Sequence, residues 1–340
     1  MPDKCVIIAE AGVNHNGSIE LAYKLIEAAH AAGADYVKFQ TFVTEEVMTA
    51  DVPRAAYQIA NSASSRQETQ LEMIKRLELP REEFWKLDAY CRRVGIKFLS
   101  TPHDVNSARF LADFKMDYVK VASGDLPNFL MLQTLADIGQ PIILSTGMST
   151  LDEIKKAVEF LHGRGMNADK VTLLHCVTDY PTPAQDANLR VMDTLAQTFR
   201  GYKIGFSDHT LGIEIALAAV ARGACVIEKH FTLDKNMDGP DHRASLEPGE
   251  LKELVRSCHN IGMALGDGTK RMTSAEEATR KVAGKSIISI RDIKKGDIFS
   301  EENIAVLRPG TGMSPMLWGE IIGTKAPHDY KKNEPLQSDS

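Results

Sequence analysis

Polar and charged residues recur at the ends of eight short apolar runs in this chain. The run ends are Glu10, 38–40, 100–101, 120–123, 145–147, His175, 207–209 and 228–230. Solubility alone would scatter such residues over the surface. They occupy instead one equivalent place in each repeat of a β–α unit, which predicts that several strand ends meet at one chemical site.

Lys38 and Lys120 lie inside otherwise apolar runs, YVKFQ and YVKVA. Burying an ammonium group is costly unless an anion compensates its charge. One interpretation is an ion pair with a carboxylate of the same fold. The other is a small, multiply charged anionic substrate, for which hydroxyl and backbone N–H groups at other run ends would be suitable phosphate ligands. The residues that favour this second interpretation are Ser123, Ser145, Thr146, Gly147 and Ser207.

His209 and His230 end two consecutive runs and form the best pair of candidate metal ligands. Neutral imidazole binds divalent transition metals, and nearby carboxylates shift the preference towards harder ions such as Mn²⁺. Glu10, Glu228 and Asp241 could supply those carboxylates. The alternative is two unrelated histidines, one of them hydrogen-bonded within the fold.

The elements that must position these residues alternate along the first 265 residues. The expected strands are 5–12, 36–42, 96–102, 118–123, 141–147, 171–177, 203–209 and 225–231. Between them, apolar residues recur at intervals of three and four, as Leu21, Leu25 and Ala28 do, which is typical of helices. Alternation alone is compatible with a doubly wound open sheet, but eight strands favour an α/β fold of the (β/α)₈ TIM-barrel type.

Two stretches depart from the repeat. Residues 45–80 form a long insertion after the second strand, and we expect it to cover the site. After a barrel over residues 1–266, residues 267–284 lose apolar periodicity and are expected to be a linker. Residues 285–340 contain short strand-like runs and turns, which predict a small second domain.

Composition excludes several classes of protein. The net charge is −6 and there is no basic tail, which argues against nucleic acid as a partner. No apolar stretch approaches the ~20 residues that span a bilayer. There is no signal-peptide pattern, and the five widely spaced cysteines are expected to be reduced, so we expect a cytoplasmic protein. No GxGxxG or P-loop motif supports a nucleotide cofactor. The segment 14–17 (NHNG) either forms a plain turn or brings His15 near the site.

The chain resembles the sialic acid synthase family, enzymes that condense phosphoenolpyruvate with amino sugars to give nine-carbon nonulosonic acids. The resemblance covers essentially the whole length, in the ordered motifs AEAGVNHNG, VKFQTF, FLSTPHD, VKVASGD, ILSTGMS, LLHCVTDYPTP, IGFSDHTLG, IEKHFTLDKNMDGPDH and VLRPGTGMSP. It implies a TIM barrel followed by a small antifreeze-like (SAF) domain. It also implies a homodimer in which each C-terminal domain caps the partner's barrel.

The resemblance also assigns roles to residues. It implies a divalent metal, most often Mn²⁺ with Mg²⁺ or Co²⁺ as alternatives, bound by His209 and His230. The residues expected to act in catalysis are Glu10, which would handle protons near the aldehyde, and Lys38 and Lys120, which would hold phosphoenolpyruvate. The residues expected to bind the substrates are Gln40, Thr101, Ser123, Ser145, Gly147, Tyr180, Ser207, Asp241 and Arg308. Some members carry Asn where this chain has Thr178, which leaves the polar contacts at that point open.

The implied reaction is that of an N-acetylneuraminate (sialic acid) synthase. Phosphoenolpyruvate would condense with N-acetylmannosamine, and phosphate would leave by C–O cleavage. The first alternative is a legionaminic acid synthase that uses 2,4-diacetamido-2,4,6-trideoxymannose. Further alternatives are a pseudaminic acid synthase, a class II metal aldolase, and a non-catalytic carbohydrate or ice binder.

Overall fold

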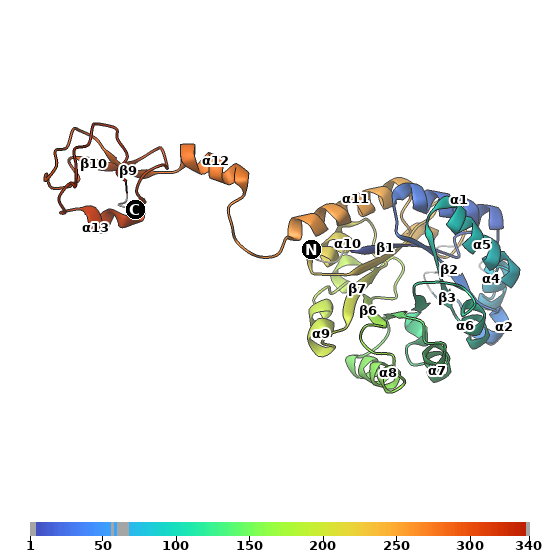
Figure 1. Ribbon diagram of the computed structural model, residues 1–340. Coiled ribbons are helices and arrows are strands. Elements are labelled where there is room, and N and C mark those ends of the chain that lie inside the picture. Colours follow the sequence, from blue (N-terminus) through green and yellow to red (C-terminus); the bar gives the residue numbers. More distant parts are fainter. Residues whose placement is uncertain (1–4, 56–57, 60–67, 338–340) are drawn as a thin grey trace. The chain divides into compact units, whose positions relative to one another are not determined.

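The computed structural model of the protein describes residues 5–55, 58–59 and 68–337 (Figure 1). The chain divides into two compact units, Met1–Asp267 and Gly268–Ser340. The first contains the expected β–α repeats and the second contains the expected small domain.

The described part of the first unit contains eight parallel strands. Their bounds are β1 (Val6–Gly12), β2 (Tyr36–Thr41), β3 (Lys97–Pro102), β4 (Val119–Val121), β5 (Ile142–Ser145), β6 (Val171–Cys176), β7 (Lys203–Asp208) and β8 (Val226–His230). They are hydrogen-bonded in the order β3-β2-β1-β8-β7-β6-β5-β4, and β3 and β4 at the two ends also contact each other. The sheet is therefore a nearly closed, TIM-like barrel. This confirms the predicted fold class.

Helices follow the strands around the outside of this barrel (Figure 1). Their bounds are α1 (Ile19–Ala32), α2 (Thr44–Val47), α4 (Gln70–Leu77), α5 (Arg81–Val94), α6 (Val105–Leu111), α7 (Phe129–Ile138), α8 (Leu151–Gly163), α9 (Val191–Thr198), α10 (Glu214–Ala221) and α11 (Pro248–Leu265). Helices α2 and α4 belong to the insertion predicted after the second strand. Residues 60–67 of that insertion lie outside the described residues.

Helix α1 shows how the sequence builds the outer layer. The hydroxyl of Ser18 accepts a hydrogen bond from the Leu21 N–H and caps the first turn. The fully buried side chains of Leu25 and Ile26 lie on the barrel-facing side, each contributing about 1.5–3 kcal/mol of burial energy. Gly33 ends the helix with φ 83°, a left-handed conformation that glycine adopts at little steric cost. Leu25→Ala would create a cavity at this contact.

The second unit begins with helix α12 (Ser274–Ala283), inside the segment in which the sequence predicts a linker. None of the helix residues is buried. Strands β9 (Ser286–Ser289) and β10 (Ile304–Leu307) pair antiparallel beyond it. They pack on a small apolar cluster formed by Ile287, Ile293, Phe299, Ile304, Ala326, Tyr330 and Leu336.

One local expectation in the second unit is wrong. The segment 319–326 (GEIIGTKA) is expected among the short strands and turns, but its first three residues belong to helix α13 (Trp318–Ile321). Trp318, Ile321 and Ile322 pack against the apolar cluster of this unit. A single helical turn therefore places these side chains on the core, and this tertiary contact outweighs the strand preference of isoleucine.

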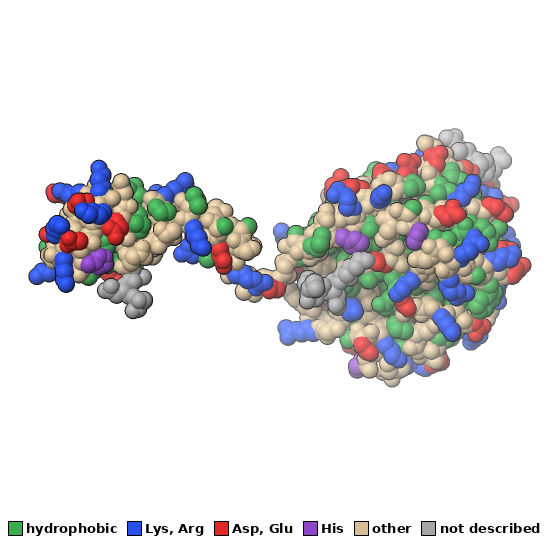
Figure 2. Space-filling model, turned by 45° about the horizontal axis from the view of Figure 1, so that its top comes forward, with side chains coloured by type: hydrophobic (Ala, Val, Ile, Leu, Met, Phe, Trp, Pro, Cys, Tyr) green, Lys and Arg blue, Asp and Glu red, His purple; other side chains and the backbone are tan. Residues whose placement is uncertain are grey.

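The surface and the thiols agree with the classes that composition excluded. On the face shown in Figure 2, basic and acidic side chains of the first unit are interspersed, without the large basic area that nucleic acid would require. Within the described ranges, no helix is both long enough and apolar enough to cross a membrane. All five cysteines are free, and only Cys225 is not fully buried.

Candidate active site

A cavity with a volume of about 390 Å³ lies where the carboxyl ends of the barrel strands meet. Most of the expected site residues line it. They are Glu10, Lys38, Gln40, Thr101, Lys120, Ser123, Ser145, Tyr180, Ser207, His209 and His230. The predicted convergence of polar strand ends is therefore present in the structure, and active sites of this fold lie at this end of the barrel.

The register of β1 with its two neighbours brings distant residues together. Glu10 of β1 lies opposite Lys38 of β2 on one side and opposite His230 of β8 on the other. Gln40 follows Lys38 by two positions, so it points to the same face, and it lies opposite Thr101 of β3. A carboxylate, an ammonium and an imidazole thus share one layer of the barrel.

Strands β7 and β8 supply a second set of side chains in the same way. Ser207 lies opposite Glu228 in the register, and its hydroxyl donates a hydrogen bond to Glu228 Oε1 at 2.9 Å. His209 follows Ser207 and His230 follows Glu228 by two positions, so each histidine shares a face with the residue before it. All four side chains line the cavity.

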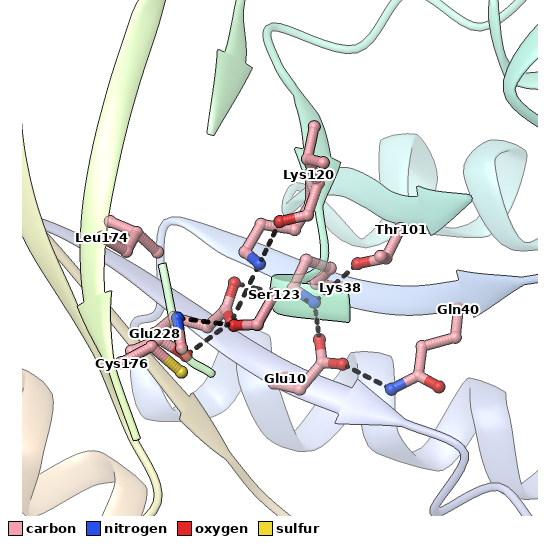
Figure 3. Close-up of polar contacts among 12 residues, drawn as sticks. Glu10, Lys38, Gln40, Thr101, Lys120, Ser123, Leu174, Cys176 and Glu228 are labelled. Carbon is pink, nitrogen blue, oxygen red and sulfur yellow. Dashed lines mark hydrogen bonds and ion pairs between the residues drawn. The ribbon is translucent and has the colours of Figure 1, made fainter. Parts of the chain in front are cut away.

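The two lysines are held by carboxylates (Figure 3). Lys38 Nζ lies 2.6 Å from Glu10 Oε2 and 3.6 Å from Glu228 Oε2, and it donates a hydrogen bond to Thr101 Oγ1 at 2.9 Å. Lys120 Nζ lies 3.7 Å from Glu228 Oε1. These ionisable side chains are buried. The lysines therefore form ion pairs with carboxylates of the same fold, as the first interpretation predicted. These ion pairs are compatible with an anionic substrate.

Burial and neighbouring charges shift the pKa values of the ionisable groups in this cluster. Burial, with a smaller contribution from the neighbouring Glu228, outweighs the opposing charge of Lys38 and raises the pKa of Glu10 to about 7. Burial lowers the pKa of Lys38, but Glu10 and Glu228 outweigh this effect and the pKa is raised. Burial also lowers the pKa of Lys120, for which Glu228 compensates only in part. Glu10 is thus the group of this cluster that exchanges a proton near neutral pH.

Hydroxyl groups lie beside the lysines. The Gly147 N–H donates a hydrogen bond to Ser123 Oγ at 3.0 Å. A Cβ at position 147 would lie 2.8 Å from Ser123 Oγ and 2.8 Å from Thr178 Cγ2, so only glycine fits there. Ser145 Oγ is buried and has no hydrogen-bond partner among the described residues. A buried hydroxyl without a partner is costly unless a ligand or water satisfies it.

The candidate metal ligands face each other across β7 and β8. The ring centroids of His209 and His230 are 5.4 Å apart, and the Tyr180 ring lies 4.1 Å from that of His209. His209 Nδ1 lies 2.6 Å from the Val177 carbonyl oxygen, to which its N–H can donate. His230 Nδ1 is buried without a hydrogen bond among the described residues and lies 3.8 Å from a carboxylate oxygen of Asp241.

The histidine pair fits a cation that takes its remaining ligands from elsewhere. Burial and the charge of neighbouring groups hold the pKa of His230 well below its usual range, so its imidazole is neutral, as a metal ligand must be. The pKa of His209 is raised instead, because Cys176 and the Val177 carbonyl outweigh the effect of burial. Within the described ranges, no group of three or more His, Cys, Asp or Glu side chains could hold a metal ion. Two protein ligands would leave the open positions that a catalytic metal needs for substrate or water.

Three other residues, which the sequence either assigned to the site or left undecided, do not line the cavity. Asp241 does not line the cavity but lies beside His230, and burial raises its pKa to about 6. Arg308 is exposed and belongs to the second unit. His15 is buried, and its Nδ1 accepts a hydrogen bond from the Gly17 N–H at 3.0 Å. The 14–17 segment is thus a turn held by its own histidine.

The structure adds cavity residues that sequence reasoning did not select. These are Ala55, Gln58, Gln70, His103, Ala122, Gly124, Met148 and Cys176. Glu228, expected among the carboxylates near the histidines, also lines the cavity, as does Thr178. Gln58 and Gln70 come from the long insertion, where no periodicity indicates which side chains turn inward. That insertion does reach the cavity, as expected.

Comparison with known proteins gives consistent results. The NeuB family model matches residues 25–270, and the SAF domain model matches residues 284–340. The chain is 46% identical to the N,N'-diacetyllegionaminic acid synthase of Campylobacter jejuni, over 97% of this chain and 98% of that protein. It is 44% identical to the enzyme of the same name from Legionella pneumophila, over 94% and 90%.

Solved structures agree with the fold. The crystal structure of the N-acetylneuraminic acid (sialic acid) synthetase of Leptospira borgpetersenii, in complex with citrate, is similar with a TM-score of 0.71. It is 35% identical and covers 82% of this chain and 90% of that one. The expected family, the barrel and the C-terminal SAF domain are confirmed. The chain belongs to the NeuB family, which contains the sialic acid and legionaminic acid synthases, and carries a SAF domain after its barrel.

Proposed function

We propose that this protein is a phosphoenolpyruvate-dependent nonulosonic acid synthase and that its acceptor is 2,4-diacetamido-2,4,6-trideoxymannose, which would give N,N'-diacetyllegionaminic acid. The observation that carries the reaction class is the convergence of two lysines, three serines and the His209–His230 pair in one cavity. The choice of sugar is supported by 46% and 44% identity to two legionaminic acid synthases.

Phosphoenolpyruvate would bind on the lysine side of the cavity. Lys120 Nζ donates to the Val121 carbonyl oxygen at 3.0 Å, and its one ion pair among the described residues is with Glu228, 3.7 Å away. An ammonium has three donors, so Lys120 can also reach a phosphate or carboxylate oxygen of the substrate. Ser145 Oγ offers a further donor without a partner. Holding the enolpyruvate in this way supplies orientation, which can lower a barrier by several kcal/mol.

The sugar aldehyde would lie on the histidine side. His209 and His230 would hold a divalent cation, most readily Mn²⁺, which when bound supplies a Lewis acid that stabilises negative charge on the aldehyde oxygen. Tyr180, whose ring lies beside that of His209, and Gln40 also line the cavity. They would orient the sugar so that its aldehyde carbon faces carbon 3 of the enolpyruvate.

Glu10 lies between the two sides. Its Oε2 is ion-paired with Lys38, and its Oε1 accepts a hydrogen bond from Gln40 Nε2 at 3.2 Å. A carboxyl group with a pKa of about 7 can both hold and release a proton under physiological conditions. We assign to Glu10 the transfer of a proton to or from the sugar oxygen.

N-acetylmannosamine is the second candidate acceptor, giving N-acetylneuraminate. It is the acceptor first expected from the sequence, and the 35% identity to the Leptospira sialic acid synthetase supports it. We put it second because the identity to the two legionaminic acid synthases is higher. The two sugars share the N-acetyl group at carbon 2 and differ at carbons 4 and 6, so the contacts that separate them must lie away from the reacting aldehyde.

One assay tests the reaction and the sugar together. Purified protein with Mn²⁺ and phosphoenolpyruvate should release phosphate with the diacetamido sugar faster than with N-acetylmannosamine, and the product mass should match the legionaminic acid. Release of phosphate with neither sugar would remove the proposed function. A reversed preference would restore the sialic acid assignment. Reversible carbon–carbon cleavage without consumption of phosphoenolpyruvate would indicate an aldolase.

Isotopic labelling tests the bond that breaks. We propose that phosphate leaves by C–O cleavage after water adds to carbon 2 of the enolpyruvate. Phosphoenolpyruvate labelled with ¹⁸O at the bridging position should then transfer its label to phosphate, as mass spectrometry of the released phosphate would show. Label retained in the sugar acid would contradict this course.

We also propose a cytoplasmic homodimer in which each SAF domain caps the cavity of the partner subunit. The open cavity mouth and the exposed Arg308 of the second unit support this arrangement. Sedimentation equilibrium should give twice the chain mass of 37.5 kDa, and a monomer at assay concentrations would contradict it.

A further inference from the structure

A buried ion pair lies on the outer face of the same two strands that carry the histidine pair. Asp208 precedes His209, and Lys229 precedes His230. Lys229 Nζ lies 2.6 Å from Asp208 Oδ2, and the exposed fractions of the two side chains are 1% and 0%. The two residues are also direct partners in the register of β7 and β8.

Alternation along the strands places this pair on the side away from the cavity. The residues on either side of Asp208 and of Lys229 line the cavity, so these two point towards the helices. Phe206 and Ile227, the preceding residues on that outer face, belong to the apolar core. The ion pair is therefore an exception in an apolar layer.

The pair also fixes the backbone around His209. Lys229 Nζ donates a second hydrogen bond, to the Thr210 carbonyl oxygen at 2.7 Å. The other oxygen of Asp208 accepts from the Thr210 N–H at 2.9 Å and from its hydroxyl at 2.8 Å. The chain on both sides of His209 is thus tied to the residue that precedes His230.

Stability alone does not explain such a pair. Well-packed apolar residues of similar volume commonly replace a buried ion pair without loss of stability. Apolar contacts are not directional, however, whereas these four hydrogen-bonding contacts specify one relative position of the two strand ends. Directional contacts are what a pair of ligands on separate strands requires, because second-shell contacts of this kind orient metal ligands.

We propose that the Asp208–Lys229 pair, with Thr210, positions His209 and His230 at the separation at which they bind one divalent cation. The pair touches neither substrate nor cation; it acts through the strand ends. This inference rests on the metal role given to the two histidines under the proposed function.

The test measures Mn²⁺ affinity in the full-length protein, by electron paramagnetic resonance of free Mn²⁺ during titration. The double variant Asp208→Leu/Lys229→Met replaces the pair with apolar residues and is expected to fold. Its dissociation constant for Mn²⁺ should rise about ten- to a hundredfold, the range seen for residues that orient metal ligands. Activity lost at low Mn²⁺ should be recovered at high Mn²⁺, with the KM for phosphoenolpyruvate unchanged.

Two further variants separate positioning from general destabilisation. Leu254→Ala removes a buried side chain of α11 and should lower the unfolding temperature while leaving Mn²⁺ affinity unchanged. Thr210→Val removes only the hydroxyl contact to Asp208 and should weaken Mn²⁺ binding about two- to fivefold, at the energetic scale of one hydrogen bond. If the double variant does not fold, the Thr210→Val measurement decides.

The outcomes are distinguishable. This inference is overturned, and the metal site is left intact, if the folded double variant binds Mn²⁺ with wild-type affinity. If the double variant does not fold, wild-type affinity in Thr210→Val overturns it in the same way. Weakened affinity in Leu254→Ala equal to that in the double variant also overturns it, because the effect is then one of stability. A wild-type protein that binds no Mn²⁺ removes the metal role itself, and this inference with it.

Discussion

The two sides of the cavity bury ionisable groups in opposite ways. On the lysine side, Lys38 keeps its charge because Glu10 lies 2.6 Å away and Glu228 3.6 Å away. On the histidine side, burial lowers the pKa of His230, and its Nδ1 has no hydrogen bond among the described residues. The charge of Lys38 is thus compensated by resident carboxylates, whereas His230 Nδ1 has no partner of this kind among the described residues.

This difference shows what each side contributes. A compensated cluster of charges can hold the barrel top together before any substrate arrives, and an anion must share its lysines with two resident carboxylates. His230 Nδ1 makes no hydrogen bond among the described residues, so it adds no hydrogen-bond energy to the fold. Mutations should therefore affect activity and stability together on the lysine side, and activity far more than stability at His230.

The largest expected effect is on the histidine side. His209→Ala and His230→Ala should each reduce metal-dependent phosphate release on the order of a thousandfold, because the charge stabilisation supplied by a cation is worth several kcal/mol. The unfolding temperature should stay close to the wild-type value in His230→Ala, whereas His209→Ala should lower it because the hydrogen bond to the Val177 carbonyl is lost. Phosphate release with saturating substrates and Mn²⁺ measures the first quantity and calorimetry the second.

An exposed histidine of α8 gives the matched control, since His162→Ala should change neither quantity. Full activity in either cavity variant would remove that histidine from the set of metal ligands.

The lysine side should lose both stability and activity. Lys38→Met leaves Glu10 buried without its nearest counter-ion, and breaking a buried pair in this way costs about 3–5 kcal/mol. The double variant Lys38→Met/Glu10→Gln should recover most of that stability but not the binding of phosphoenolpyruvate. Urea unfolding and calorimetric titration with phosphoenolpyruvate measure the two effects. A single variant as stable as the wild type would show that the comparison between the two sides is wrong.

Arg308 tests whether the second unit contributes to the cavity. Arg308→Ala should raise the KM for the sugar by about tenfold, which corresponds to one lost charge-assisted contact, and should leave phosphoenolpyruvate binding nearly unchanged. Arg291→Ala, which removes a surface pair with Glu302 in the same unit, is the control and should have no effect. An unchanged KM in Arg308→Ala would count against capping by the SAF domain.

An effect that is confined to acidic pH concerns a buried histidine outside the cavity. Burial lowers the pKa of His15 from about 6.5 to about 4, so between these pH values the unfolded chain binds a proton that the folded protein does not. The free energy of unfolding should therefore fall as the pH drops from 6.5 towards 4, by up to about 1.4 kcal/mol per pH unit from this residue.

His15→Asn retains a side-chain acceptor for the turn and should remove this share of the pH dependence. Its stability curve, measured by urea unfolding at several pH values, should be flatter than that of the wild type. Parallel curves would show that His15 does not cause the loss of stability in acid.

Much of the site could be predicted because barrel geometry is regular. Once the eight strands are recognised, the position of each polar residue at a strand end places it at the cavity, as with Glu10, Lys38 and His230. The same regularity applies to Glu228, which shares a face with His230. Gln58 and Gln70 could not be predicted, because an irregular segment has no period that relates a side chain to the cavity.

Local sequence by itself determined the barrel, its strand ends and the set of side chains that meet there, since hydrophobic periodicity and strand alternation are local properties. Only the tertiary structure decided which charges pair. The lysines are compensated within the cavity and His230 is not, although all of them occupy equivalent positions in the repeat. Pairing depends on distances of 2.6–3.7 Å between atoms on different strands, and such distances follow from the register and curvature of the closed sheet.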